Sequence, residues 1–122
     1  MALRFNGVTT SSYSRHELNG NGSALSSNAN INQTFIRLDA VSDGGQNANA
    51  FDAMILDILD FSNTNKNKTV RSFKGKTGTQ QGIRLESGLF RDTSAITSMT
   101  FNFALTSENF VSGCRFSLYG IR

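Results

Sequence analysis

The sequence is poor in the residue types that most often build catalytic, metal or disulfide sites. Its 122 residues include no proline, no tryptophan, one histidine (His16) and one cysteine (Cys114). A single cysteine cannot form an internal disulfide, and it suits synthesis in a reducing cytoplasm. A structural zinc site needs several histidine or cysteine ligands, which this chain lacks. We therefore expect no disulfide, no metal site and no cofactor.

Long apolar runs and a strong net charge are also missing. No run approaches the length needed to span a membrane, and the first residues, MALRFNG, contain no apolar core of a signal peptide. The net charge of +3 is too small to indicate nucleic acid by itself, because phosphate binding needs basic residues gathered on one face. We expect neither a membrane nor a nucleic acid as partner, and no export by a signal peptide.

One basic cluster does occur, in a stretch of sequence that contains no acidic residue. Its members are Lys66, Lys68, Arg71, Lys74 and Lys76. One interpretation is a solvated hairpin whose lysines discourage pairing with other strands. The other is a contact with a partner protein, for which Lys66, Lys68, Lys74 and Lys76 are the candidate residues.

The residues that are present indicate one globular domain covering residues 1–122. The hydrophobic fraction is 38%, and ten phenylalanines supply bulk for a core. A chain of this length closes one core but not two. With no proline and eleven glycines, the chain reversals must depend on Gly and Asn, which reach positive φ at low cost. These features are typical of a protein rich in hairpins.

Alternation of apolar and polar residues is the main structural signal. It is clear between residues 97 and 105, where Met99, Phe101 and Phe103 would share one face of a strand. Residues 113–121 show the same period, which predicts a strand that ends close to the last residue. In this strand Cys114 would be in phase with Phe116 and Leu118, as a buried and inert thiol rather than a nucleophile.

The stretch from Phe51 to Phe61 allows two interpretations. Its apolar residues fall at helical spacing, but a strand also fits, with apolar residues on both faces as expected for a strand covered on both sides. The following Asn-rich turn, SNTNKNK, and the β-type run TVRSF favour the strand. In a strand, Asp57 and Asp60 point to opposite faces and cannot act as a catalytic carboxylate pair.

Other possible chemical sites are weak. His16 lies in a polar stretch, where a surface role is more common than a catalytic one. The SDGG at residues 42–45 lacks the spaced ligands of a calcium loop, and the GKTG at residues 75–78 lacks the spacing of a phosphate-binding loop. We expect that the protein is not an enzyme and has no catalytic residues.

Together the patterns predict an all-β protein of about eight strands. The expected strands cover residues 2–6, 11–18, 33–41, 51–62, 68–75, 82–87, 96–105 and 113–121. Short antiparallel strands joined by Gly and Asn turns indicate a two-sheet antiparallel sandwich of jelly-roll type.

Three phrases of the sequence resemble a recurrent small domain of tailed-bacteriophage virion proteins. They are RFNG followed by SSYSRHELNGNGSA, then MILDILDFSNTNKNKTVRSFKG, and finally ITSMTFNFALTSENFVSGCRFSLYGIR. The resemblance covers nearly the whole chain. It implies a β-sandwich that serves as a virion structural or appendage module, with no catalytic residues to transfer.

One departure from that family concerns the N-terminus. Relatives usually carry another apolar strand before the RFN phrase, whereas this sequence begins at MALRFN. The resemblance therefore implies an open strand edge at Leu3 and Phe5, filled by another copy or by a capsid partner. Leu3 and Phe5 join the lysines as candidate contact residues.

The resemblance leaves two functions open. The first is a capsid decoration, or cement, protein of the virion that binds the major capsid protein or other virion proteins and forms a homo-oligomer. The alternative is a tail or head fibre module that binds host surface carbohydrate, for which Tyr13 and Tyr119 with the Asn-rich loops are candidates.

Overall fold

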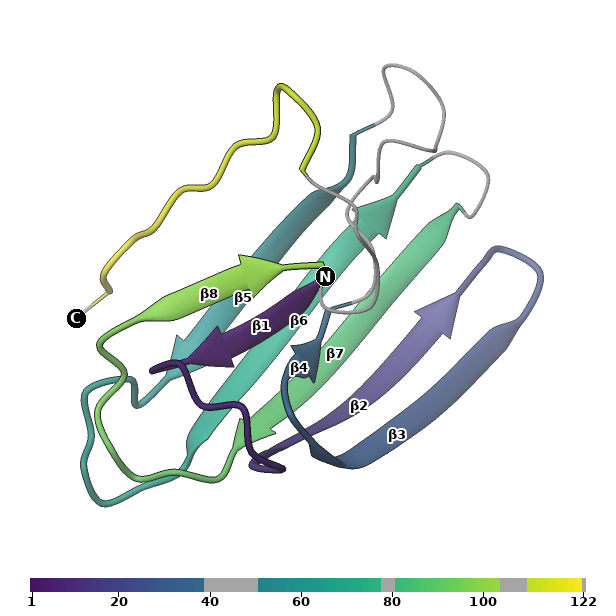
Figure 1. Cartoon of the computed structure of the whole chain (residues 1–122). Coiled ribbons are helices and arrows are strands. Elements are labelled where there is room, and N and C mark those ends of the chain that lie inside the picture. Colours follow the sequence, from purple (N-terminus) through teal and green to yellow (C-terminus); the bar gives the residue numbers. More distant parts are fainter. Residues whose placement is uncertain (39–50, 78–80, 104–109, 122) are drawn as a thin grey trace.

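The computed structural model describes residues 1–38, 51–77, 81–103 and 110–121, and these residues contain strands and no helix (Figure 1). The strands are β1 (Ala2–Phe5), β2 (Tyr13–Gly20), β3 (Leu25–Gln33), β4 (Ile36–Arg37), β5 (Ala53–Leu59), β6 (Lys68–Lys76), β7 (Gly82–Phe90) and β8 (Met99–Asn102). The all-β prediction is confirmed.

The strands form two antiparallel sheets that pack face to face. The larger sheet has the order β3-β2-β7-β6-β5, and the smaller has the order β4-β1-β8. The chain passes repeatedly from one sheet to the other, and Figure 1 shows the smaller sheet lying over one face of the larger. The predicted two-sheet sandwich is therefore confirmed.

The stretch from Phe51 to Phe61 contains strand β5, and the helical alternative is wrong. Register with β6 pairs Ile55 with Phe73 and Leu59 with Thr69. Asp60 takes a φ of 57° at the turn that follows β5. One detail of the prediction is wrong, because Ile55, Leu59 and Phe61 are exposed, so β5 is covered on one face only.

The polar strand β3 was not predicted from the sequence. Its residues are almost all exposed, so no buried face marks it in the sequence. It forms because Asn21 closes a hairpin: its Oδ1 accepts hydrogen bonds from the amides of Ser23 and Ala24, and Gly22 takes a φ of 90°. β3 is then held by its backbone ladder to β2.

Two predicted strands differ from the structure. Of the strand predicted over residues 33–41, the described part contains Gln33 at the end of β3 and the short strand β4 at Ile36 and Arg37. Residues 39–41 lie outside the described residues, as do 104 and 105 of the strand predicted over residues 96–105. Residues 113–121 form no strand. Alternation shows which side chains share a face, but a strand also needs a neighbour to complete its hydrogen-bond ladder.

The core lies where β1 crosses the end of the larger sheet. The phenol ring of Tyr13 stacks on Phe90 with 4.9 Å between ring centroids, and Phe5 packs on Phe90 at 5.4 Å. Tyr13 also accepts a hydrogen bond from the amide of Phe5 at 3.1 Å and donates one to the carbonyl of Val8 at 3.1 Å. Leu3 and Ile36 complete this buried contact between the sheets.

Candidate interaction sites

The two apolar residues expected at an open edge are in the core instead. Leu3 and Phe5 are fully buried. Strand β1 pairs with β4 on one side and with β8 on the other, so it is the central strand of its sheet. The prediction that Leu3 and Phe5 present an open edge is wrong, because later strands of the same chain satisfy both edges of β1.

The lysines do not form one surface either. Lys68 is fully buried, and its ammonium donates hydrogen bonds to the backbone carbonyls of Asn63, Lys66 and Thr93 at 2.6, 2.6 and 3.1 Å. Lys68 thus fastens the turn after β5 to the segment after β7. This correction removes it as a candidate for partner contact.

Lys74 is also buried, whereas the other two candidate lysines reach the surface to different degrees. The ammonium of Lys74 has no hydrogen-bond partner, and desolvation lowers its pKa from 10.5 to about 8 although the carboxylate of Glu86 acts in the opposite direction. Lys66 is well exposed, near Asp60 at 3.7 Å, and Lys76 is half-buried. Lys66 and Lys76 remain candidates for contact, and Lys74 does not.

A polar network surrounds Lys74 on the inner face of the larger sheet. Arg15 lies 3.2 Å from Glu86 and 2.9 Å from Glu17, and the hydroxyl of Ser72 donates to Glu86 at 2.6 Å. The side chains of Arg15 and Glu86 are buried, so their charges depend on each other rather than on water. This network has the features of a structural element, and sequence spacing gave no sign of it.

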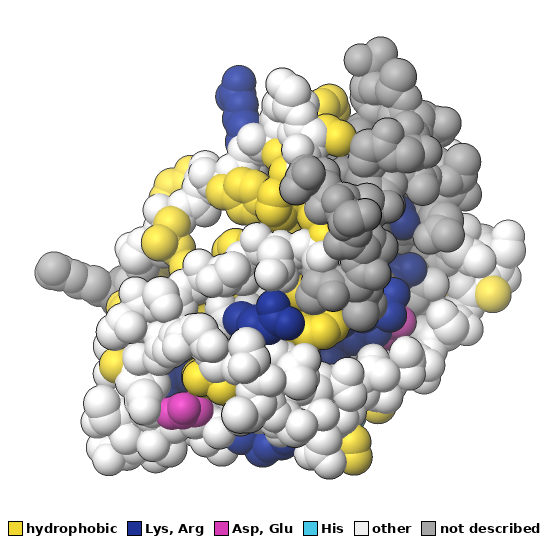
Figure 2. Space-filling view, viewed as in Figure 1, with side chains coloured by type: hydrophobic (Ala, Val, Ile, Leu, Met, Phe, Trp, Pro, Cys, Tyr) yellow, Lys and Arg dark blue, Asp and Glu magenta, His cyan; other side chains and the backbone are white. Residues whose placement is uncertain are grey.

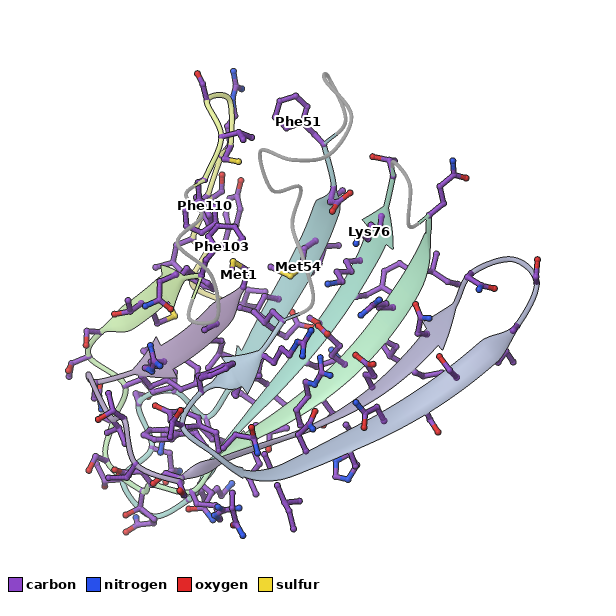
Figure 3. The ribbon with its side chains drawn as sticks, turned by 45° about the vertical axis from the view of Figure 1, so that its right-hand side comes forward. Met1, Phe51, Met54, Lys76, Phe103 and Phe110 are labelled. Atoms are coloured by element: carbon purple, nitrogen blue, oxygen red, sulfur yellow. The ribbon has the colours of Figure 1, made fainter. Side chains whose placement is uncertain are left out.

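An apolar groove of about 470 Å³ lies between β5 and the C-terminal segment, residues 110–121. Its walls include Met54, Leu56 and Ile58 of β5, Phe101 of β8, and Phe116 and Leu118 of the C-terminal segment. Figure 3 shows Met54 on the side of β5 that faces Phe103 and Phe110. The inward residues of β5 remain half-exposed because no described strand fills the space in front of them.

Aromatic contacts hold the C-terminal segment at the groove, and its residues 111–121 join no strand that the structure describes. The ring of Phe116 lies 5.7 Å from that of Phe101 and 5.1 Å from that of Phe110. Leu118 and Tyr119 are each 80% exposed. Figure 2 shows hydrophobic side chains at the surface in this region. The segment therefore provides an apolar wall that has not been buried by folding.

Cys114 does not have the environment that was predicted for it. It is half-buried in the groove wall, and Phe116 and Leu118, expected to share a buried face with it, are exposed. The prediction of a buried thiol is wrong, because residues 113–121 do not enter a sheet. Cys114 instead lines the groove.

One polar group in the groove lacks a partner. Asp52 lines the groove, and its Oδ1 accepts a hydrogen bond from the amide of Thr77 at 2.9 Å. Its other oxygen, Oδ2, is buried without a hydrogen-bond partner. A buried carboxylate oxygen in this state gains stability from any N–H that reaches it.

The remaining sequence candidates have surface or structural roles. His16 is exposed, as predicted. Asp57 forms an ion pair with Arg71 at 2.8 Å across neighbouring strands. Among the described residues, no group of three or more His, Cys, Asp or Glu could hold a metal ion, and no helix is long and apolar enough to cross a membrane. The SDGG motif and Gly78 lie outside the described residues.

No protein-family model matches the chain, and no match is found among curated proteins or solved structures. The apolar groove and the three sequence phrases are therefore the basis for a proposal about function.

Proposed function

We propose that this protein is a structural component of a tailed-phage virion that binds the outside of the capsid as a decoration protein. The sequence phrases supply the expectation of a virion module. The observation that carries the proposal is the apolar groove between β5 and the C-terminal segment, because an apolar groove of this size, left open by the described residues, is typical of a binding site.

The expected occupant is an extended apolar segment of a capsid protein. Among the described strands β5 pairs only with β6, and β8 pairs only with β1, so each presents one edge toward a new strand. An extended segment can add to such an edge through main-chain hydrogen bonds. Every second side chain would then point into the groove.

The alternative function, host carbohydrate binding, has less support. It was expected to use Tyr13 and Tyr119 as exposed aromatic residues. Tyr13 is fully buried and its hydroxyl is used inside the core, whereas Tyr119 is exposed. A single tyrosine beside an apolar groove fits a protein partner better than a polar sugar.

Copy number in purified virions tests the proposal. A decoration protein should be present in numbers comparable to the capsid subunits, measured by quantitative mass spectrometry against the major capsid protein. A copy number typical of a fibre would favour the alternative, and absence from virions would overturn both.

A pair of variants tests the groove itself. Leu118→Asp places a charge on an exposed wall of the groove and should reduce cosedimentation with phage heads by at least about tenfold, since apolar contact would be replaced by a desolvated charge. Ile31→Asp makes the same kind of change at an exposed residue of β3 and should bind normally. Equal binding by wild type and Leu118→Asp would exclude the groove.

A further inference from the structure

The outer face of the larger sheet carries a second apolar surface, separate from the groove. Strand registers place Ile55, Phe73, Leu85 and Leu18 side by side in one row across β5, β6, β7 and β2. Their side chains are 68%, 52%, 48% and 49% exposed. None of the described segments covers this face (Figure 1). Four half-exposed apolar residues in one continuous row are a sign of an interface.

The row next to it contains one large side chain, Ile83, among small residues: Ala53, Gly75 and Gly20. Register places Gly75 of β6 beside Ile83 of β7. Ile83 is 58% exposed, whereas a Cβ added at Gly75 would meet nothing within 4 Å. In this row, Ile83 of β7 therefore projects from the sheet, and Gly75 of β6 leaves room for a side chain from a partner.

The row on the opposite side has an acid at one end and an imidazole at the other. Register places Asp57, Arg71, Ser87 and His16 in order across the same four strands. Asp57 and His16 are thus on the two outer strands of the four, at the same height along the sheet.

We propose that a second copy of this chain packs on this face, with a two-fold axis parallel to the strands and between β6 and β7. This axis places each β5 over the partner's β2 and each β6 over the partner's β7, as in aligned sheet packing. Phe73 then faces the partner's Leu85, and Ile83 faces the empty position at the partner's Gly75. The proposal goes beyond the proposed function, which uses the groove.

The same axis also pairs the polar groups. Asp57 comes to lie opposite the partner's His16, so the imidazole N–H can donate a hydrogen bond to the carboxylate. Each row thus faces the same row of the partner in reversed strand order, as an isologous interface requires. A different partner protein would need to supply this arrangement independently, whereas a second copy has it already.

The size of the face is sufficient for a specific but modest interface. Beyond the row of Asp57, the registers place a fourth row on this face, made of Leu59, Thr69, Leu89 and Ser14. Four strands about 4.8 Å apart and four rows about 6.8 Å apart give about 500 Å² per copy, or about 1,000 Å² in total, which is the lower limit for a specific contact. A reversible dimer is expected, rather than an obligate one.

Sedimentation velocity on the purified wild-type chain tests the proposal, and a concentration-dependent dimer is expected. Gly75→Gln fills the empty position without a clash inside its own subunit, so it should weaken dimerisation at least about tenfold while the circular dichroism spectrum stays unchanged. The matched control, Ile31→Gln on β3, alters an exposed residue outside the four strands and should dimerise normally.

A charge exchange tests the orientation. His16→Asp places two carboxylates opposite each other and should weaken the dimer, and adding Asp57→His in the same chain should restore it. A wild type that is monomeric at all concentrations, or a Gly75→Gln variant that dimerises as the wild type does, would overturn the proposal. So would a monomeric wild type whose binding to phage heads is lost in Phe73→Ser, since the occupant of this face would then be a capsid protein.

Discussion

The guanidinium of Arg15 donates a hydrogen bond to Oε1 of Glu86 at 3.2 Å inside the sandwich, where both side chains are almost fully buried. The second carboxylate oxygen of Glu86 accepts from the hydroxyl of Ser72. The pair joins β2 to β7 and, through Ser72, to β6. The part of the inner face around Arg15 and Glu86 is thus organised by charge rather than by apolar packing.

Removal of the carboxylate should be costly. Glu86→Ala leaves the buried cation of Arg15 with fewer partners, and we expect a loss of about 3 to 5 kcal/mol in the free energy of unfolding. Glu86→Gln keeps the shape and one acceptor and should lose less. The comparison is Asp57→Ala, which breaks the exposed ion pair with Arg71 and should cost less than about 1 kcal/mol. Urea denaturation measures all three, and equal losses would contradict the assigned role of Glu86.

The buried ammonium of Lys74 should make stability depend on pH. Its pKa is about 8 in the folded protein, because burial disfavours the charged form, against 10.5 as the ordinary value. Between these two pH values the unfolded chain binds more protons than the folded protein, so the free energy of unfolding rises with pH. The full difference is on the order of 3 kcal/mol.

Urea denaturation at several pH values from about 8 to about 10 measures this rise, within the range set by the two pKa values of Lys74. Lys74→Met keeps an unbranched side chain without the charge, and its stability should not rise with pH over this range. It should also be more stable than the wild type at neutral pH, because an ammonium without a hydrogen-bond partner is removed. If the free energy of unfolding of Lys74→Met rises with pH as much as that of the wild type, another group must cause the pH dependence.

The hydroxyl of Tyr13 offers a third test. It is buried and bonded to the backbone at both ends of the turn after β1, and burial raises the pKa of the phenol. Tyr13→Phe leaves the amide of Phe5 and the carbonyl of Val8 without this partner, so a loss of about 1 to 3 kcal/mol is expected. The near-ultraviolet circular dichroism of the variant should show that the ring still stacks on Phe90, and an unchanged unfolding midpoint would contradict the assigned role.

The fold class was predictable from sequence because its signals are local. Alternation in β6 and β7 and the Asn-Gly turn at Asn21 each specify a strand or a reversal without any distant information. Strand β3 was not predictable, since its exposed polar residues carry no pattern. The segment after Gly113 shows the opposite error: its alternation is strong, but no described strand lies beside its backbone.

The candidate sites were less predictable than the fold. Leu3 and Phe5 were expected at an edge because the family that the sequence resembles usually carries another strand before the RFN phrase. In the structure β4 and β8, from distant positions in the sequence, pair with β1 instead. Along β6, Lys68 and Lys74 are in phase with Val70 and Ser72, so the two lysines share their inward face. The groove and the outer row depend on which strands become neighbours, which one strand's sequence does not specify.

The two sheets are in close contact at Gly88 of β7, which packs against Ile36 of β4. A Cβ added there would lie 2.8 Å from Cδ1 and 2.9 Å from Cγ2 of Ile36, so Gly88→Ala should force the sheets apart and lose about 1 to 3 kcal/mol. Gly75→Ala is the matched control in the neighbouring strand, because its Cβ meets open space, and its stability should equal or exceed that of the wild type. Ile36→Val combined with Gly88→Ala removes Cδ1, the nearest contact, and should regain part of the loss. Thermal unfolding of the four proteins measures this, and a Gly88→Ala variant as stable as Gly75→Ala would show that the sheets are not in close contact at this position.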